Sequence, residues 1–268
     1  MGLSERPGGR ESERGPSGPA EGQERGALSV TVLGCSGTYP GADGACSGYL
    51  VRSPGASVVV DLGAGTLANL QHHLAIGDID ALVLSHSHPD HWLDVPLLRN
   101  AMRYVLGVEG LDVYGTAETL ALAVTLLGDL APTLRWQIIK ETSTVEVGDQ
   151  VVRFSRTDHP VETLAVRVDA DGRSLLYSAD TGAGWDPGAV GAGVDLFVCE
   201  ASLDPEHEGL VQHLSARQAG DLARNMGADR LLLTHVVPGV DARVQLEAAK
   251  QAFGGPVELA AANRSLEV

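Results

Sequence analysis

Cysteines, aromatic residues and long apolar runs are all scarce in this chain. Its 268 residues include three cysteines, Cys35, Cys46 and Cys199, and aromatic residues make up only 4%. Three cysteines are too few for a disulfide framework, which indicates a reducing compartment, so we expect a cytoplasmic protein. The sequence has no run of the roughly 18 apolar residues that a transmembrane helix needs, and it therefore predicts no membrane span and no membrane partner.

Basic residues are in the minority as well. There are 19 Lys and Arg against 35 Asp and Glu, for a formal net charge of -16. Nucleic-acid binding depends on Lys and Arg contacts to phosphates, so this balance weighs weakly against such a partner. The first 26 residues are mostly Gly, Pro, Ser, Glu and Arg. That composition predicts a disordered tail over residues 1–26, without the apolar segment of a signal peptide, and a folded domain over residues 27–268.

The most informative segment that is present is LVLSHSHPDHWLD, which contains the pattern His-x-His-x-Asp-His. Its members are His86, His88, Asp90 and His91. The preceding Ala81–Ser85 is a short apolar run that predicts a buried strand, and an extended continuation places the first two histidines on the same side. Pro89 then bends the chain toward an expected helix, so the aspartate and the last histidine project from a different backbone direction. The first pair can hold one ion and the second pair another.

The donor types narrow the choice of metal. Neutral imidazole and carboxylate without thiolate suit zinc, with iron and manganese as alternatives. A histidine-rich surface loop is the competing interpretation, and the buried strand directly before the motif disfavours it.

The motif resembles that of the metallo-β-lactamase superfamily, which binds one or two metals between two packed αβ halves. In such proteins the other ligands are isolated residues at later strand ends, and this sequence has them in order. They are His159 after Val151–Arg156, Asp180 after Ser174–Ser178, and His235 after Arg230–Thr234. The resemblance implies two divalent ions per chain, one held by His86, His88 and His159 and the other by Asp90, His91 and His235. It further implies that Asp180 bridges the two ions.

Asp61 is a candidate support for this site. It ends the strand-like segment Val58–Asp61 and is followed by glycines that permit a tight turn. The resemblance implies that its carboxylate accepts the second N–H of a ligating histidine. A helix N-cap ahead of Leu67–Leu74 is an alternative of equal weight.

Strand and helix patterns alternate in two blocks from Leu28 onward, without a linker between them. The strands of the first block are expected at Leu28–Leu33, Gly48–Arg52, Ser57–Asp61, Ala81–Ser85 and Leu111–Tyr114, with helices at Thr66–Ala75 and Ala117–Leu127. Those of the second block are expected at Val145–Val147, Val151–Ser155, Leu164–Val168, Ser174–Ser178, Val194–Val198, Leu231–Thr234 and Val257–Leu259, with helices at Ser215–Asn225 and Ala242–Phe253. We expect an α/β protein built as a four-layer αβ/βα sandwich, with two mixed sheets flanked by helices and the metals at the rim between the sheets.

Substrate class depends on residues beyond the ligands. The stretch from Phe197 to Ala223 resembles the Glu-Ala and His-Leu-Ser elements of the phosphodiesterase branch, and Glu200 and His213 are the matching positions. The resemblance implies that His213 lies over the metals and is oriented by Glu200. A protonated histidine there could stabilise charge on the phosphorane or protonate the leaving oxygen. A local hydrogen bond of His213 ahead of a Ser215 N-cap is the alternative.

Within this branch the chain is most similar to short bacterial cyclic nucleotide phosphodiesterases, through segments such as VTVLGCSGTYPG, LLYSADTG and HLSARQAG. This implies hydrolysis of a small phosphodiester, 3',5'-cyclic AMP or cyclic GMP, to the 5'-monophosphate. RNase Z proteins insert a long arm between the third metal histidine and the bridging aspartate. Here His159 and Asp180 are separated only by a strand, a turn at Asp171-Gly172 and a strand. An RNase Z-like endonuclease acting on transfer RNA precursors is the second alternative, and a non-catalytic module stabilised by metal is the third.

Three further residues are candidates for substrate contact. Ser36 and Thr38 follow the first expected strand, and Arg103 lies on the expected helix after the metal loop. Asp90, His213 and Glu200 are the expected catalytic residues. The sequence does not fix the oligomeric state, and a homodimer is among the alternatives.

Overall fold

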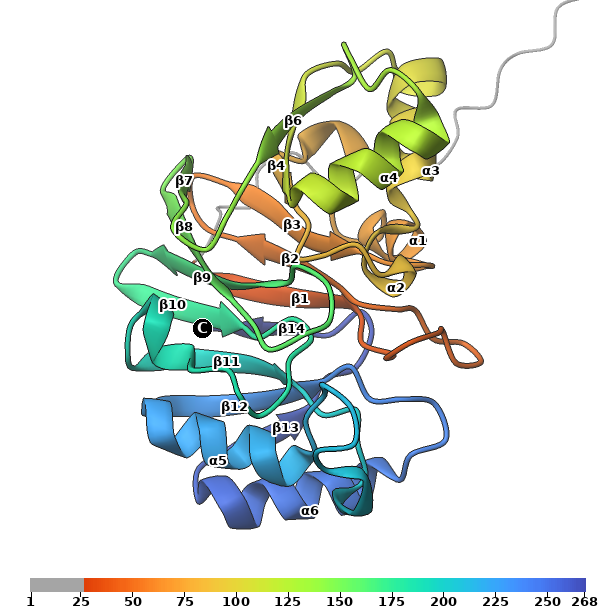
Figure 1. The fold of residues 1–268 in the computed structure, drawn as a ribbon. Helices are drawn as coiled ribbons and strands as arrows, with labels where there is room; N and C mark the ends of the chain where they lie inside the picture. Colours follow the sequence, from red (N-terminus) through yellow and green to blue (C-terminus); the bar gives the residue numbers. More distant parts are fainter. Residues whose placement is uncertain (1–26) are drawn as a thin grey trace, which may run out of the picture.

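Two seven-stranded sheets pack face to face in this computed structural model, which describes residues 27–268 (Figure 1). The tail predicted over residues 1–26 lies outside the described residues. Helices cover the outer face of each sheet, so the layers run helix, sheet, sheet, helix (Figure 1). Both sheets contain parallel and antiparallel pairs. The predicted four-layer sandwich of two mixed sheets is confirmed.

The first sheet has the strand order β14-β1-β2-β3-β4-β5-β6. Its strands are β1 (Ser29–Gly34), β2 (Gly48–Arg52), β3 (Ser57–Leu62), β4 (Ala81–Val83), β5 (Leu111–Gly115), β6 (Leu134–Ile138) and β14 (Ser265–Glu267). Its helical segments are α1 (Thr66–Leu70), η1 (Ile76–Asp78), α2 (Pro89–Trp92), α3 (Val95–Asn100), the π-helical η2 (Ala101–Leu106) and α4 (Ala117–Leu127).

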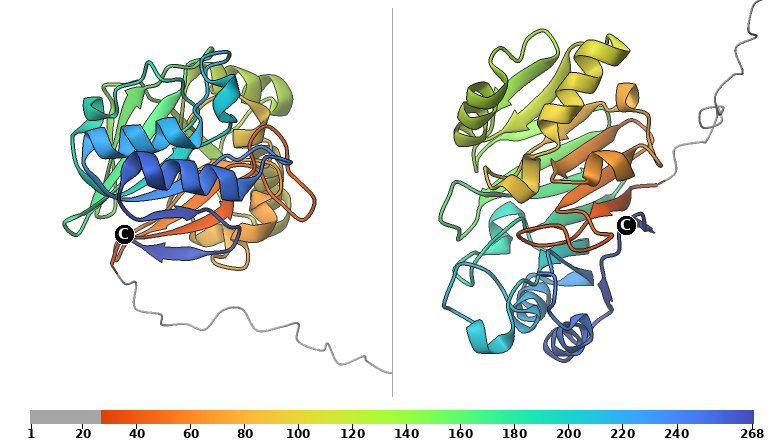
Figure 2. Two further views of the ribbon diagram at one scale, coloured as in Figure 1. Left: turned by 90° about the horizontal axis from the view of Figure 1, so that it is seen from below. Right: turned by 90° about the vertical axis from the view of Figure 1, so that its right-hand side faces the viewer.

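The second sheet has the strand order β13-β12-β11-β10-β9-β8-β7. Its strands are β7 (Thr144–Val147), β8 (Gln150–Arg156), β9 (Leu164–Ala170), β10 (Arg173–Tyr177), β11 (Val194–Glu200), β12 (Ala228–Thr234) and β13 (Val257–Leu259). Its helical segments are η3 (Pro187–Val190), η4 (Pro205–His207), α5 (Ala216–Met226) and α6 (Ala242–Phe253). The last two lie side by side on the outer face of this sheet (Figure 2).

Apolar side chains form a core on each side of each sheet. Central strands such as Ser57–Leu62 are buried along their whole length, which is why their sequences are continuous apolar runs and not alternating ones. One face of each sheet contributes to the cluster between the sheets, for example Val60 and Val166. The opposite faces pack against helices, as Leu82 does under α3 and Phe197 under α5. Burial on both faces makes the strand ends firm supports for the loops that follow them.

Most of the predicted elements agree with the structure to within a few residues, but two strands were missed. β6 and β14 are edge strands whose residues are largely exposed, so they lack the apolar pattern that reveals a buried strand. The helix predicted over Thr66–Ala75 ends at Leu70, where the chain continues in turns. No helix within residues 27–268 is both long and apolar enough to span a membrane.

Candidate metal centre and active site

The His-x-His-x-Asp-His motif follows β4 at the rim between the two sheets (Figure 1). β4 is buried and ends at Val83, and the short helix α2 starts at Pro89, where a missing N–H and a fixed φ suit the first helical turn. The chain is still extended at His88, with φ -67° and ψ 140°. The two histidines before the helix and the two residues on it therefore reach the same space from different directions, as the sequence predicted.

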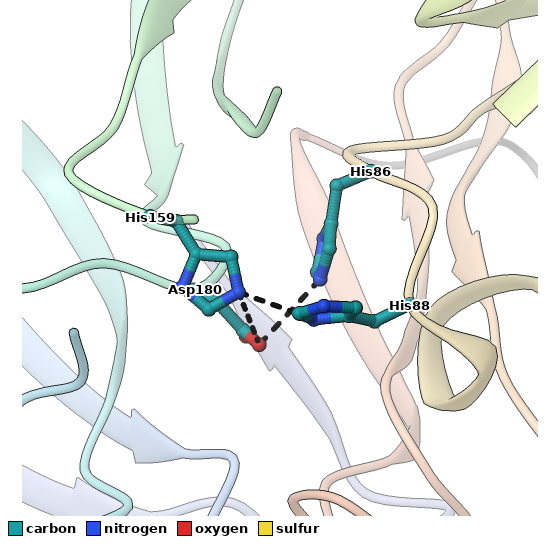
Figure 3. Close-up of side chains that lie close together, drawn as sticks. All are labelled: His86, His88, His159 and Asp180. Atoms are coloured by element: carbon teal, nitrogen blue, oxygen red, sulfur yellow. Dashed lines mark hydrogen bonds and ion pairs between the residues drawn. The ribbon is translucent and has the colours of Figure 1, made fainter. Parts of the chain in front are cut away.

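Three loops of the second sheet meet this motif. His159 follows β8, Asp180 follows β10 and His235 follows β12. All seven predicted ligands come together as two groups, in each of which the candidate ligand atoms lie within 4.8 Å of one another. The first group is His86, His88, His159 and Asp180 (Figure 3), and the second is Asp90, His91 and His235. Both groups are able to bind metal.

Asp180 lies between the two groups and turns one oxygen toward each. Its Oδ2 is 3.5 Å from His86 Nε2 and 3.9 Å from His159 Nε2. Its Oδ1 is 3.3 Å from His91 Nε2 and 3.4 Å from His235 Nε2. One carboxylate thus faces both candidate ligand groups.

Buried polar atoms without hydrogen bonds mark the same place. Asp180 Oδ1 and His86 Nε2 are both buried and make no hydrogen bond. An unsatisfied buried polar group costs about 1–3 kcal/mol, so natural proteins rarely leave two of them facing the same space. A divalent cation in each group would give one of these atoms a partner, and the donor set therefore fits metal.

Four of the five ligand histidines are held so that Nε2 is the nitrogen that faces Asp180, whereas His88 approaches His159 Nε2 through Nδ1 at 3.1 Å. The acceptors at Nδ1 are Ser85 Oγ for His86 at 3.0 Å, Asp61 Oδ2 for His91 at 2.7 Å, the Gln212 carbonyl for His159 at 3.1 Å and Ser202 Oγ for His235 at 2.8 Å. An acceptor at Nδ1 selects the tautomer that carries its proton there, which leaves the Nε2 lone pair for a metal.

The protonation states of His86 and Asp180 suit a cation, whereas burial lowers the pKa values of His91 and His235 but the neighbouring carboxylates raise them above the usual value. Burial and the neighbouring His91 lower the pKa of His86 well below its usual value, so this imidazole stays neutral. Burial raises the pKa of Asp180, but His235, His91 and His86 outweigh it and hold that pKa well below the usual range. Neutral imidazole and ionised carboxylate are the forms that bind metal.

Asp61 supports the motif and does not cap a helix. Its Oδ2 accepts the Nδ1–H of His91 at 2.7 Å and the Ser85 hydroxyl at 2.8 Å. The predicted N-cap is wrong, because α1 begins after Gly65 and has no side-chain cap. Asp94 Oδ2 instead accepts the N–H of Leu67 at 2.9 Å.

Glu200 and His213 form a pair beside the second group. The Nδ1–H of His213 donates to Glu200 Oε1 at 2.9 Å, and a nitrogen of His213 lies within 4.8 Å of candidate ligand atoms on Asp180 and His235. Burial lowers the pKa of His213, but the hydrogen bond and charge of Glu200, with Asp180, raise it to about 9. The imidazole therefore carries a proton at neutral pH, and the geometry directs it toward the metal groups.

Ser202 is a contact that the sequence did not reveal. Its hydroxyl donates to Glu200 Oε2 at 2.7 Å, and because that uses its only proton, His235 Nδ1–H donates to Ser202 Oγ at 2.8 Å. One buried serine thus connects the His213–Glu200 pair to a candidate ligand. Tyr177 was missed as well, and its hydroxyl donates to Asp61 Oδ2 at 3.1 Å. A serine two residues after Glu200 and a tyrosine at a strand end are too common in proteins to signal these roles.

The three residues predicted to contact substrate lie in different places. Thr38 has φ 64° and donates its backbone N–H to Asp90 Oδ2 at 2.8 Å, so its contact with the site is through the main chain. Ser36 lines a separate cavity beside Val236. Arg103 is exposed on η2, with its guanidinium carbon 5.7 Å from the ring centroid of Tyr104. Substrate contacts for these residues stay predictions.

Comparison with known proteins places this fold and site in a family. Residues 41–236 match the model of the beta-lactamase superfamily domain. This chain is a metallo-β-lactamase superfamily hydrolase of the RNase Z-like branch. Metallo-hydrolase relatives support its metal dependence, and the seven clustered residues are the candidate ligands.

Three relatives resemble this hydrolase over nearly its whole length. The uncharacterized protein Rv1339 of Mycobacterium tuberculosis is 35% identical, covering 90% of this chain and 93% of the relative. The probable metallo-hydrolase YhfI of Bacillus subtilis is 30% identical, covering 87% and 97%. The YhfI crystal structure superposes with a TM-score of 0.84, at 28% identity, over 90% of this chain and 99% of that one. Ribonuclease Z of Methanopyrus kandleri is 27% identical, covering 84% and 93%.

Proposed function

We propose that this hydrolase holds two divalent ions and cleaves a phosphodiester, with 3',5'-cyclic nucleotides as its substrates. His86, His88 and His159 would hold one ion, Asp90, His91 and His235 would hold the other, and both groups would share Asp180. Zinc suits these nitrogen and oxygen donors, with manganese and iron as alternatives. Ions bound there supply Lewis-acid polarisation of a phosphoryl oxygen and an activated water.

The observation that carries the proposal is the position of His213. Hydrolysis of a phosphodiester needs a proton for the departing oxygen, and a protonated group beside the metal groups can provide it. His213 Nδ1 is engaged by Glu200, so Nε2 is the nitrogen available to a substrate. The hydrogen bond and charge of Glu200 favour the imidazolium form that carries this proton. In a 3',5'-cyclic nucleotide the 3' oxygen would receive it, giving the 5'-monophosphate.

The chain's own residues keep His213 in place. Glu200 is buried and accepts the N–H of Thr181 at 2.7 Å and the hydroxyl of Ser202 at 2.7 Å, besides the imidazole. These donors hold the carboxylate in a position that does not depend on substrate. His213 is therefore oriented before substrate arrives, which is what efficient proton transfer requires.

The connection between His159 and Asp180 favours a small substrate. It consists of β9 and β10, which form an antiparallel hairpin across the turn at Asp171 and Gly172, as the sequence predicted. No inserted arm of the kind that would hold transfer RNA lies between these two described residues.

An RNase Z-like endonuclease is the second candidate function. The 27% identity to Ribonuclease Z of Methanopyrus kandleri favours it, because the match covers most of both chains. A nucleic-acid partner belongs only to this alternative. The third interpretation, a non-catalytic module, is disfavoured by membership in the metallo-hydrolase family. Cytoplasmic location and a homodimer stay predictions.

One experiment separates the two enzymatic functions. Purified protein is loaded with zinc or manganese and assayed against 3',5'-cyclic AMP, 3',5'-cyclic GMP and a precursor transfer RNA, each with and without a chelator. We expect chelator-sensitive formation of 5'-monophosphate and no cleavage of the RNA. Efficient cleavage of the precursor with both cyclic nucleotides left intact would replace the first function with the second.

A further inference from the structure

A cavity of about 240 Å³ adjoins the candidate active site on the His213 side. Its wall combines Asp158 with residues 182–184 and residues 209–213. The first of these precedes His159 in the chain, the second segment follows Asp180, and the third ends at His213 itself. The cavity therefore shares His213 with the metal site, and a molecule bound at the metals could extend into it.

Asp158 organises this wall. Its Oδ1 accepts the side-chain N–H of Gln212 at 2.8 Å, and its Oδ2 accepts the backbone N–H of Gly184 at 3.0 Å. A Cβ at Gly182 or Gly184 would lie only 2.6 or 2.7 Å from an Asp158 carboxylate oxygen, so a side chain there would push the segment away. The glycines allow the loop to close on the carboxylate, and the wall is formed before any ligand binds.

Two residues that line the cavity are large and apolar. Leu210 and Val211 are 71% and 54% exposed, although both are large hydrophobic residues. The segment that carries them is held at its two ends. Gln212 bonds to Asp158, and Glu208 Oε1 accepts the Nε–H of Arg217 at 3.0 Å. The cavity thus offers apolar side chains for a flat ring to rest on.

The side chains of Gln212 and Asp158 leave hydrogen-bond acceptors free in the wall, and Gln218 adds an amide N–H₂ donor. Gln212 uses its amide N–H on Asp158, which leaves its Oε1 to accept, and each Asp158 oxygen keeps a second lone pair. Such acceptors match the ring and amino N–H groups along the edge of a nucleobase. They repel phosphate, because the carboxylate is an anion, so the phosphate end of a substrate is directed to the metals and the uncharged end to the cavity.

We propose that this cavity is the nucleoside subsite of the enzyme. The base rests on Leu210 and Val211 and donates hydrogen bonds toward Asp158 and Gln212, while the phosphodiester lies over the metals beside His213. The cavity is smaller than the roughly 300–1,000 Å³ of pockets for drug-sized ligands, which suits one nucleoside unit. This inference rests on the proposed phosphodiesterase function and names the part of the substrate that sets affinity.

The test compares two inhibitors of the hydrolysis of bis(p-nitrophenyl) phosphate, a substrate without a nucleoside. One inhibitor is a nucleoside 5'-monophosphate, adenosine or guanosine, and the other is inorganic phosphate. The variants are the double substitution Leu210→Ser with Val211→Ser, and Gln212→Ala. A matched double variant, Leu126→Ser with Val244→Ser, removes apolar side chains that are 59% and 54% exposed on α4 and α6. Metal content and circular dichroism are measured for every variant.

We expect the apolar double variant to raise the inhibition constant of the monophosphates roughly tenfold, and Gln212→Ala to raise it roughly fivefold. The constant for inorganic phosphate should stay within about twofold, and the matched variant should change neither constant. Equal changes for nucleotide and phosphate, or no change for either, would overturn the subsite. If wild type fails to hydrolyse cyclic nucleotides yet shows this discrimination, the proposed function fails while the nucleoside subsite stands.

Discussion

Replacing Glu200 with Gln removes the charge that keeps His213 protonated. The pKa of His213 stands at about 9 against an ordinary 6.5, with Glu200 as the main group that raises it. At about 1.4 kcal/mol per pKa unit, the difference corresponds to about 3 kcal/mol in favour of the imidazolium. In the variant only Asp180 is left to oppose burial, so the pKa should fall from about 9 back toward 6.5.

The variant can keep all but one of the local hydrogen bonds. Thr181 N–H and His213 Nδ1–H need an acceptor at the Oε1 position, which the amide oxygen provides. The amide N–H₂ then takes the Oε2 position and donates to Ser202, whose hydroxyl can turn to donate to the His235 carbonyl at 3.1 Å. The N–H of Leu214, 3.3 Å from Oε2, loses its acceptor, and we expect a cost of about 1–3 kcal/mol in the free energy of unfolding.

Two measurements check this prediction. In chelator-treated protein, NMR titration should place the pKa of His213 near 9 in wild type and lower in Glu200→Gln, with the signal identified by its loss in His213→Ala. In metal-loaded enzyme, kcat should fall as pH rises through the pKa of this acid, and that fall should occur at lower pH in Glu200→Gln. An unchanged His213 titration, or a kcat profile that does not move, would refute the role of Glu200.

Further predictions follow from the same contacts. Elemental analysis should find two ions per chain, and Asp180→Ala should lower both metal content and turnover. Folded protein that stays metal-free after zinc supplementation would contradict the metal site. His213→Ala should retain both ions while kcat drops about 100-fold, and near-normal kcat would return this residue to a structural role. Ser202→Ala should weaken metal affinity about 10- to 100-fold, with recovery in Ser202→Thr, as measured by competition with a chromogenic chelator. In chelator-treated protein the His213–Glu200 pair should stabilise the fold fully below pH 6.5 and lose that contribution as pH rises through about 9, because the pKa of His213 is higher in the folded than in the unfolded chain. Denaturant unfolding across that pH range measures the contribution, and a free energy of unfolding that does not change with pH would argue against the pairing.

Elements with a strong apolar pattern were predicted well, and elements without one were not. The strand at Gly48–Arg52 and the helices at Ala117–Leu127 and Ala242–Phe253 have the predicted bounds, because burial on one or two faces imposes the pattern. β6 and β14 form because a neighbouring strand offers hydrogen bonds at the edge of the sheet, and that information lies in the partner strand. Of the two roles predicted for Asp61, the structure shows the contact with a ligating histidine and not the N-cap, and its contact with Tyr177, far along the chain, left no local signal.

The sequence by itself determined the family, the fold class and the identity of the clustered donors. A run of histidines and an aspartate after a buried strand, followed by isolated donors at later strand ends, is specific because few other uses demand those residues at those places. Tertiary structure alone decided how Asp180 divides its two oxygens, which nitrogen each histidine turns inward, and that Ser202 connects Glu200 to His235. The cavity lined by Asp158, Leu210 and Gln212 also exists only in the tertiary structure. These features depend on distances between residues far apart in the chain, which the packing of the two sheets sets and no local pattern records.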